Sequence, residues 1–259
     1  MNKTVLITGG SSGIGYALAR VFAENSYNLV LAAKTKEPLV KAAEDLKSFG
    51  TKVEIVVIDL AKPESPTQLY SELHKRQISI DVLINNAGFA SYGSFIENDL
   101  DWELNEMQVN MVTLTHLTKL FARDMVKRKH GKILNVASTA AFLPGPLMAV
   151  YYASKAYVLS FSEALAEELR DTGVSVSALC PGPTNTGFVK RAQLQQSKLF
   201  QGDIMQADDV AKAAFKGLME NQTVIIPGIK NQFIVGAIKF VPRKFVPKVV
   251  KQMQAKEDK

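Results

Sequence analysis

The sequence predicts an α/β protein built on a doubly wound parallel sheet. Short, continuous runs of Val, Ile and Leu, typical of strands buried on both faces, alternate with longer segments of helical periodicity. No repeat, low-complexity tract or Pro/Gly linker divides the 259 residues. Hydrophobic residues make up 47% of the chain, which is enough to form one core, so a single domain is expected.

The first third of the chain is expected to hold four strands separated by three helices. An apolar run at residues 4–8 leads through a Gly/Ser turn into an amphipathic helix at 14–24. The next elements are a strand at 29–33, a charged helix at 38–49, a strand at 53–58, a polar helix at 65–76 and a strand at 82–85.

The rest of the chain continues the alternation. The elements expected there are a long helix at 100–129, a strand at 131–136, a helix at 151–171, a strand at 174–179, a helix at 207–220 and a short strand at 224–226. Strands joined through helices pair in parallel and are covered on both faces, which is the Rossmann architecture.

The positive charge of the protein is confined to its C-terminal end. Residues 230–259 contain eight of the 31 Lys and Arg but two of the 25 Asp and Glu, so they carry the net charge of +6 and residues 1–229 are balanced. We predict a Rossmann domain at 1–229 and a basic amphipathic extension at 230–259. No nucleic-acid partner is expected, because the charge is not spread over the domain and no such motif accompanies it.

Two interpretations of residues 231–254 stay open. Apolar residues alternate there with Lys and Arg, as in segments that lie on anionic membrane surfaces. Alternatively, the segment is a helical hairpin that covers the protein's own pocket or a partner subunit. We favour the hairpin, because Pro242 and Pro247 prevent one long interfacial helix.

Other residue types bear on the compartment and on metals. Cys180 is the one cysteine, so no internal disulfide can form, and no stretch approaches the roughly 18 apolar residues of a membrane span. A cytoplasmic protein is therefore expected. His74, His116 and His130 show no ligand spacing, so we expect no metal site.

The turn after the first strand carries the first chemical signal. Residues 8–15 read TGGSSGIG and lie between the strand and the first helix. Glycines let the backbone approach a pyrophosphate, whose charge then lies at the helix N-terminus. The turn therefore predicts a dinucleotide site.

The end of the second strand bears on the choice between NAD and NADP. An acidic residue there would hydrogen-bond the adenosine ribose and repel a 2′-phosphate. The chain instead continues from Ala33 to Lys34, whose cation favours NADP(H), while NAD(H) stays possible.

Tyr151 and Lys155 are four residues apart on a predicted helix and so share a face. A neighbouring ammonium favours the phenolate, so Lys155 is expected to lower the pKa of Tyr151 toward the range of a proton donor. Tyr152 lies about 100° around the helix and is expected to pack.

Together these motifs resemble the short-chain dehydrogenase/reductase family in its shorter, non-extended branch. The resemblance covers residues 3–229, and its further motifs are Asp59-Leu60, Asn85-Asn86-Ala87-Gly88, Asn110, Ser138 and Pro181-Gly182. It implies a catalytic set of Asn110, Ser138, Tyr151 and Lys155. Tyr151 would protonate the substrate oxygen, Ser138 would hydrogen-bond it, Lys155 would also hold the nicotinamide ribose, and Asn110 would maintain a distorted helix and a water chain.

The resemblance also implies the residues around the dinucleotide. These are Gly9, Ser11, Ser12, Gly13, Ile14, Lys34, Asp59, Leu60, Asn86, Ala87, Gly88, Tyr151, Lys155, Pro181, Gly182, Thr184 and Thr186. One position departs from the pattern, because many NADP-type members have a basic residue where this chain has Ser12.

The substrate pocket is expected from residues 140–150 and from the loop after Pro181. Its apolar candidates are Phe142, Leu143, Leu147, Met148, Phe188, Leu194, Leu199 and Phe200. They suit either a hydrophobic carbonyl or the packing of a lid. We expect an NADPH-dependent reductase of a hydrophobic ketone, aldehyde or 3-oxoacyl substrate, in a homodimer or homotetramer. The alternative is a sensor or scaffold that binds NADP(H) without turnover.

Overall fold

Seven parallel strands form one sheet in the computed structural model, which describes residues 2–188, 192, 204–238 and 240–254. Across the sheet they are β3 (Val53–Val57), β2 (Asn28–Ala33), β1 (Thr4–Thr8), β4 (Val82–Asn85), β5 (Gly131–Val136), β6 (Val174–Leu179) and β9 (Val224–Ile225). Each of the seven strands lies within one residue of its predicted bounds. The doubly wound sheet is therefore confirmed.

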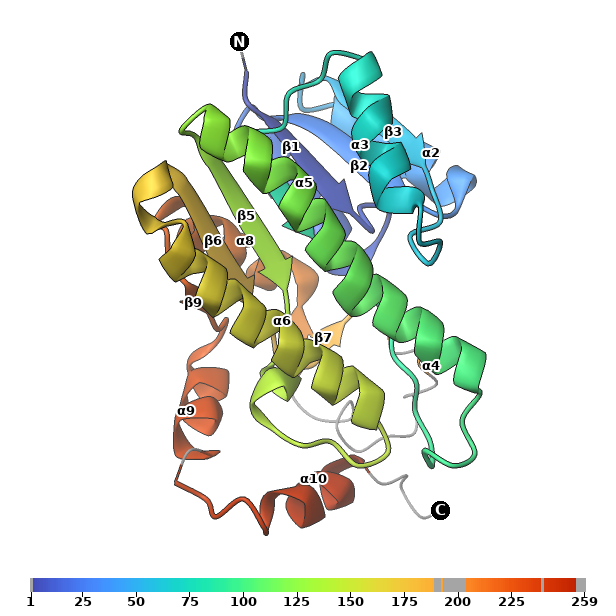
Figure 1. The fold of residues 1–259 in the computed structure, drawn as a ribbon, viewed down its shortest axis with the longest axis vertical. Coiled ribbons are helices and arrows are strands. Elements are labelled where there is room, and N and C mark those ends of the chain that lie inside the picture. Colours follow the sequence, from blue (N-terminus) through green and yellow to red (C-terminus); the bar gives the residue numbers. More distant parts are fainter. Residues whose placement is uncertain (1, 189–191, 193–203, 239, 255–259) are drawn as a thin grey trace.

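Helices cover both faces of this sheet (Figure 1). On one face lie α1 (Gly13–Glu24), α2 (Lys36–Lys47) and α8 (Ala207–Met219), and on the other lie α3 (Ser65–Lys75), α5 (Leu114–Lys127) and α6 (Ala149–Glu168). Side chains of β1 alternate between the two cores: Val5 and Ile7 belong to the first and Leu6 to the second. Because β1 is buried on both faces, successive residues on both sides of it are apolar.

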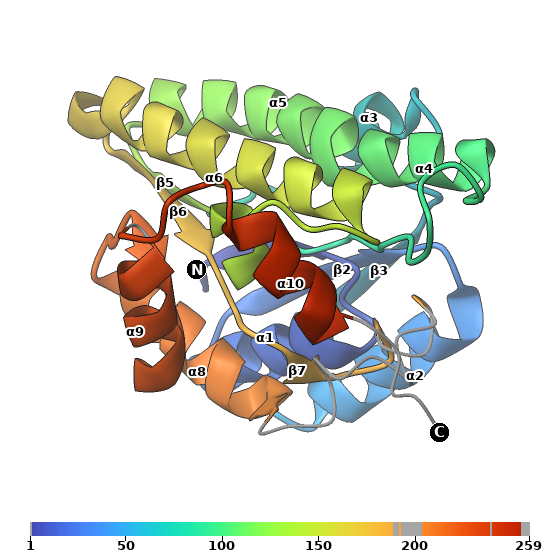
Figure 2. The ribbon, with the colours of Figure 1, turned by 90° about the horizontal axis from the view of Figure 1, so that it is seen from below.

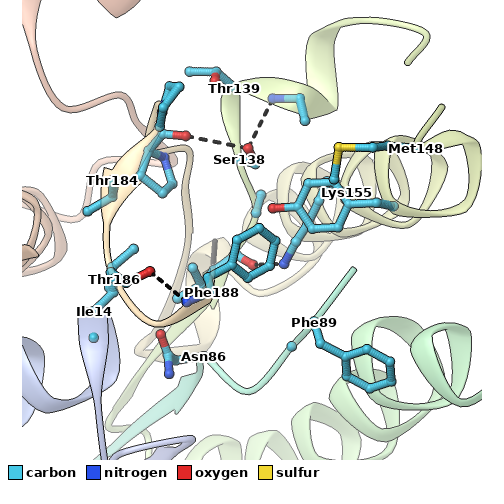
Figure 3. Close-up of a pocket in the computed structure, with 18 of the residues that line it drawn as sticks. Ile14, Asn86, Phe89, Ser138, Thr139, Met148, Lys155, Thr184, Thr186 and Phe188 are labelled. Carbon is cyan, nitrogen blue, oxygen red and sulfur yellow. Dashed lines mark hydrogen bonds between the residues drawn. The ribbon is translucent and has the colours of Figure 1, made fainter. Parts of the chain in front are cut away.

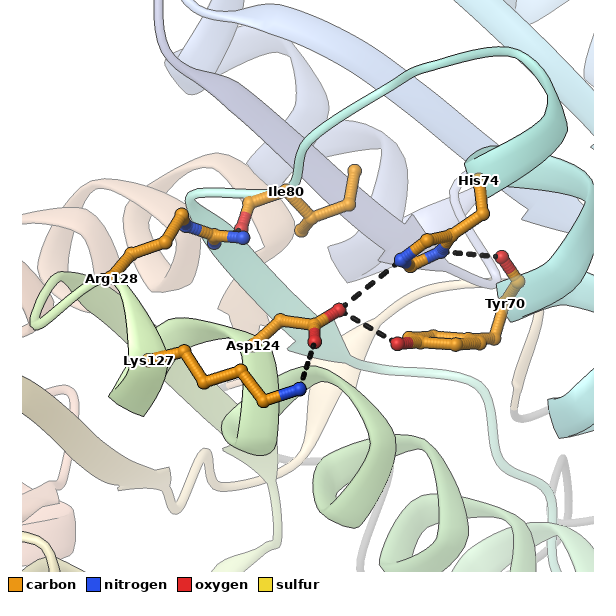
Figure 4. Close-up of polar contacts among 6 residues, drawn as sticks. All are labelled: Tyr70, His74, Ile80, Asp124, Lys127 and Arg128. Atoms are coloured by element: carbon orange, nitrogen blue, oxygen red, sulfur yellow. Dashed lines mark hydrogen bonds and ion pairs between the residues drawn. The ribbon is translucent and has the colours of Figure 1, made fainter.

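Polar contacts reinforce the apolar packing of α3 against α5 (Figure 4). The hydroxyl of Tyr70 donates to Asp124 Oδ2 at 2.7 Å, and His74 Nε2 lies 3.3 Å from the same oxygen. The Arg128 guanidinium donates to the carbonyl oxygen of Ile80 at 2.7 Å. The contacts of Asp124 join α3 to α5, and the Arg128 bond ties the end of α5 to the segment that precedes β4.

The helix expected at residues 100–129 is present, with a change of pitch inside it. It begins as α4 (Leu100–Met107), passes into a π-helical segment, Gln108–Thr113, and continues as α5. Wider turns of this kind are rare and occur mostly at functional sites. The segment contains Asn110, for which a distorted helix was expected.

Several short elements were not predicted, because they are too short to show a period. They are the 3₁₀ turns Thr139–Phe142 and Arg170–Thr172 and a two-stranded sheet of β7 (Thr184–Asn185) and β8 (Met205–Gln206).

Residues after β9 form two further helices, α9 (Ile229–Ile238) and α10 (Val246–Gln254). Both lie at the end of the molecule to which the sheet strands point, and Figure 2 looks onto them. Val246 and Val250 of α10 pack in a small core with Met148 and Tyr152. No helix among the described residues is long and apolar enough to cross a membrane. The division of the chain at residues 229 and 230 stays a prediction.

The strand order reverses between β1 and β4, since β2 and β3 lie on one side of β1 and the later strands on the other. The loops after β1 and β4 therefore leave the sheet in opposite directions and open a crevice at their carboxyl ends. In α/β sheets this is where ligands bind.

Candidate active site

A cavity of about 1020 Å³ opens at this crevice. It is lined by every predicted catalytic and cofactor-binding residue except Asn110. Residues reach it from the loops after β1, β2, β3, β4, β5 and β6 as well as from α6, α9 and α10. Figure 3 shows the part of the cavity around Ser138 and Lys155. The folded chain thus brings together motifs that are spread over more than 170 positions of the sequence.

The glycine loop is shaped for the close approach of a ligand. Gly13 has a φ of +56°, which disfavours side chains, and a Cβ on Gly15 would lie 2.3 Å from the carbonyl oxygen of Gly9. Ser12 is the N-cap of α1 without a side-chain capping bond, and the first turn contains no acidic residue. Free backbone N–H groups without a nearby carboxylate fit a pyrophosphate.

Hydrogen bonds join this loop to the loop after β4. The Asn86 side chain donates to the carbonyl oxygens of Thr8 at 2.9 Å and Gly9 at 3.2 Å. The Thr8 hydroxyl in turn accepts from the backbone N–H groups of Asn86 and Ala87, both at 3.0 Å. Asn86 therefore fixes the shape of the crevice, and Thr8, which sequence reasoning did not single out, is its partner.

Lys34 and Asp59 form an ion pair at the rim of the cavity, with Nζ and Oδ2 2.8 Å apart. Burial alone would raise the pKa of Asp59, but hydrogen bonds from Lys34 and from the backbone of Ala61 bring that pKa below its ordinary value. The Lys34 side chain is 72% exposed and can reach a ligand in the crevice. Its charge is already shared with Asp59.

Ser138 follows β5 and begins the 3₁₀ turn. Its hydroxyl accepts from the backbone of Ala140 at 3.1 Å and lies 3.4 Å from the carbonyl oxygen of Pro181 (Figure 3). The same hydroxyl is near enough to the phenol of Tyr151 to lower the pKa of that group. Ser138 is thus both a turn serine and a polar group that faces the cavity.

Tyr151 keeps part of its surface open to the cavity, but it lies deep in the protein. Phe188 flanks it, with ring centroids 5.5 Å apart. Burial strongly raises the pKa of Tyr151, and hydrogen bonding by Ser138 offsets this only in part. The expectation that the pKa of Tyr151 is lowered is therefore wrong for this structure: the pKa is raised, and Lys155 is not among the groups that shift it.

Lys155 is buried below Tyr151, with Nζ 5.6 Å from the centre of the tyrosine ring. Its ammonium donates to the carbonyl oxygen of Val136 at 2.8 Å. Burial lowers the pKa of Lys155 to about 8, against the opposing influence of Glu106. A carbonyl at the end of β5 thus holds the ammonium beside the phenol.

Asn110 lies behind the cavity wall and is buried. Its amide nitrogen donates to the carbonyl oxygen of Phe89 at 3.0 Å and to the Ser154 hydroxyl at 3.1 Å, while its oxygen accepts from the backbone of Phe89 at 3.3 Å. These bonds tie the π-helical segment to α6 and to the loop after β4. The described contacts of Asn110 position other parts of the site.

Glu106 is a further ionisable group that sequence reasoning missed. It has no solvent exposure, and its Oε2 accepts from the backbone of Ser91 at 2.7 Å, while Oε1 has no protein partner among the described residues. Burial raises the pKa of Glu106 to about 7, although Lys155 opposes this. The detectable signal was its place on the apolar face of the long helix, one turn before Asn110.

Apolar side chains form the other end of the cavity. Phe142, Leu143, Met148 and Phe188 line it as expected, whereas Leu147 is not among the lining residues. The expected residues Leu194, Leu199 and Phe200 lie outside the described part of the chain. The cavity is further lined by side chains of α9 and α10, in agreement with the interpretation that residues 231–254 cover the pocket. They are Ile234, Val235, Ile238, Val249, Val250 and Met253.

The part of the chain that the structure describes holds no group of three or more His, Cys, Asp or Glu arranged for a metal ion. The groups at the wall of the cavity are a phenol, a hydroxyl and an ammonium. They can bind and protonate an oxygen atom, which is acid–base chemistry.

Comparisons with known proteins agree with this chemistry. The statistical model of the family described as short chain dehydrogenase matches residues 3–197. Estradiol 17-beta-dehydrogenase 11 of Homo sapiens is 30% identical over 263 residues, which cover 99% of this chain and 85% of that protein. Ketoacyl reductase HetN of Nostoc sp. is 31% identical over 225 residues, covering 86% and 78%. A short-chain dehydrogenase from Sphingobium yanoikuyae, solved with NADPH, has a TM-score of 0.82 at 32% identity, covering 93% and 97%.

The chain therefore belongs to the short-chain dehydrogenase/reductase family and is an oxidoreductase. Its fold and the order of its motifs are those that the resemblance implied.

Proposed function

We propose that the protein is a reductase that prefers NADPH and acts on a hydrophobic ketone, aldehyde or 3-oxoacyl compound. One observation carries the proposal: Ser138, Tyr151 and Lys155 meet in the cavity that begins at the glycine loop and ends in apolar side chains. The relative solved with NADPH and the ketoacyl reductase named above support it.

The chain supplies both oxygen-binding groups for reduction. A carbonyl oxygen placed between the Ser138 hydroxyl and the Tyr151 phenol would accept a hydrogen bond from each, which stabilises negative charge on that oxygen. The chemistry supplied by a bound reduced nicotinamide is hydride transfer to the carbonyl carbon. Tyr151 then gives its proton to the oxygen and completes the alcohol.

The pKa of Tyr151 favours this direction. Because burial raises it, the phenol is protonated throughout the neutral range and is ready to donate. The nearby ammonium of Lys155 compensates for the negative charge that the phenol acquires as it loses the proton. Val136 keeps the ammonium in place.

NADPH consumption by the purified protein, measured against hydrophobic ketones, aldehydes and 3-oxoacyl thioesters, tests the proposal. Tyr151→Phe should lower kcat by about 10²- to 10⁴-fold, the usual contribution of a general acid. NADPH affinity should change by less than about threefold, since the phenyl ring keeps the packing. The matched control is Tyr152→Phe, which removes a hydroxyl bonded to Gln254 and should cost much less turnover.

Absence of turnover with every compound, together with tight NADPH binding, would favour the sensor or scaffold instead. Equal losses in the Tyr151 and Tyr152 variants would refute the role of Tyr151 as proton donor.

A further inference from the structure

The surface formed by α9, α10 and the segment between them carries an unusual share of exposed apolar side chains. Eight of the 18 exposed large apolar residues in the described part of the chain lie in residues 229–253. They are Ile229, Phe233, Ile234, Phe240, Val241, Phe245, Val249 and Met253. Below, these eight residues are called the apolar patch. Clustered exposed apolar side chains of this kind mark interaction sites.

The most exposed members face outward. Ile229 and Phe233 are 85% and 77% exposed and lie one turn apart on α9, so they share a face. Phe240, in the segment between the two helices, is 89% exposed. In a monomer these side chains meet water, although the same helices bury Val235 and Val250 against the protein.

Basic residues occupy the same segment as the apolar patch. Five exposed basic residues accompany it in the described part of the segment: Lys230, Arg243, Lys244, Lys248 and Lys251. Residues 229–254 contain no Asp or Glu, and none of these five cations forms an ion pair in the described structure. The Lys244 ammonium lies 5.1 Å from the centre of the Phe245 ring, which places charge and apolar surface side by side.

The charge of this surface indicates which kind of partner binds it. A surface that is basic and apolar at once repels a second copy of itself, but it matches anionic headgroups above an acyl layer. The two helices need not form one long rod, because both lie on the same end of the molecule (Figure 2). We propose that α9, α10 and the segment between them dock on the surface of a bilayer that contains anionic lipids.

Docking would place the cavity next to the lipid. Ile234, Val249 and Met253 belong to the apolar patch and also line the cavity. An apolar carbonyl compound dissolved in the bilayer would then meet the cavity mouth directly. This consequence, unlike docking itself, rests on the proposed function.

Vesicle co-sedimentation of the full chain tests docking without any turnover. The probes are vesicles of phosphatidylcholine alone and of phosphatidylcholine with phosphatidylglycerol. We expect binding to the anionic vesicles that is at least tenfold tighter than to neutral ones and that weakens with salt.

Two double variants separate the contributions: Phe233→Ser/Phe240→Ser for the apolar part and Lys244→Glu/Lys248→Glu for the charge. Each should lower anionic-vesicle binding at least tenfold while NADPH affinity stays within about twofold. The controls are Phe49→Ser and Lys47→Glu/Lys52→Glu. These three residues are exposed and lie just before β3, at the edge of the sheet opposite β9. They should bind vesicles like the unmodified protein.

Equal affinity for both kinds of vesicle, or unchanged binding in the two double variants, would overturn the proposal. So would a loss of oligomers in the Phe233→Ser/Phe240→Ser variant without any vesicle binding by the unmodified protein, since that outcome assigns the patch to a contact between copies of the chain. Failure of docking would leave NADPH turnover intact, so it can be told apart from failure of the proposed function.

Discussion

Lys34 is the residue on which the proposed preference for NADPH rests. Its ammonium already pairs with Asp59, so a 2′-phosphate would have to share the cation with a carboxylate. Ser12, at the position where many NADP-type relatives have a basic residue, supplies no second charge. The preference for NADPH over NADH should therefore be modest and should rest on one side chain.

Lys34→Ala should raise the Kd for NADPH about tenfold, because it removes one partly solvated charge-assisted hydrogen bond. The Kd for NADH should stay within about twofold of its original value. Fluorescence titration with each nucleotide measures both constants. Lys36→Ala, an exposed lysine two residues further on, is the matched control. Equal weakening of NADH and NADPH would show that Lys34 does not recognise the 2′-phosphate.

Glu106 is expected to act on the reaction through Lys155. Its negative charge raises the pKa of Lys155, which burial has lowered to about 8. Glu106→Gln removes that charge, so Lys155 should lose its proton at a lower pH and the alkaline limb of kcat should move to lower pH. At pH 8 we expect a loss of about two- to tenfold, with little change near pH 6. Glu103→Gln, which alters a buried carboxylate one turn earlier, should leave the limb in place.

The same carboxyl should make stability depend on pH. The pKa of Glu106 is about 7 in the folded protein against an ordinary 4.5, so the folded state holds its proton more tightly than the unfolded state. The free energy of unfolding should then fall by about 3 kcal/mol as pH rises from 4.5 through 7. Glu106→Gln should remove this fall in denaturant titrations. An unchanged pH dependence in the variant would mean that Glu106 is not the group responsible.

Sequence reasoning located residues that directly follow strands and missed residues whose place depends on packing. Asp59, Asn86, Ser138 and Pro181 were predicted from the family resemblance, while the apolar pattern predicted the strands whose ends bring them to a common edge. The burial of Glu106 was missed: its position on the long helix was a signal, but the loop after β4 that contacts it is not visible in the sequence pattern. The pKa of Tyr151 was misjudged for the same reason: its depth in the protein is not visible in a Tyr-x-x-x-Lys spacing.

At the scale of elements, the long helix shows what a pattern can and cannot specify. Its apolar periodicity predicted one helix from residue 100 to 129 but gave no sign of the π-helical segment. The wider turn places Asn110 where its side chain reaches both Phe89 and Ser154. The wider turn depends on contacts with neighbouring elements, which the apolar periodicity of the helix does not report. The distorted helix at Asn110 was therefore expected from the family resemblance alone.

For α9 and α10 the sequence predicted the elements but not their contacts. Their prolines correctly indicated a division into short segments, yet the sequence left open what lies against them. In the structure each helix has one side on the cavity and another side in solvent. The segment therefore covers the pocket, as one interpretation predicted, while the membrane interpretation stays a prediction that rests on the apolar and basic composition of the outer side.

At the scale of the whole molecule, a second apolar region remains exposed on the layer of α4, α5 and α6, away from the apolar patch. Leu104, Met107 and Val112 on the long helix and Tyr157 on α6 are exposed. The Tyr157 and Thr115 hydroxyls lie 2.8 Å apart, which joins the two helices into one continuous face. An exposed apolar face of two long helices fits a symmetric contact with a second copy, in which the same residues meet across the axis.

Val112→Glu/Tyr157→Glu should therefore convert a homodimer or homotetramer into smaller species. Each copy would bring two carboxylates into the contact, and like charges without partners at a symmetric interface cost several kcal/mol, enough to raise the dissociation constant at least about a hundredfold. Sedimentation velocity at micromolar concentration measures the change, and Phe49→Glu, on the far edge of the sheet, should sediment like the unmodified protein. A monomeric unmodified protein, or an assembly that survives both glutamates, would mean that the chain does not associate through these helices. The cavity lies within one chain, so NADPH binding should persist in the dissociated variant, which separates assembly from the site itself.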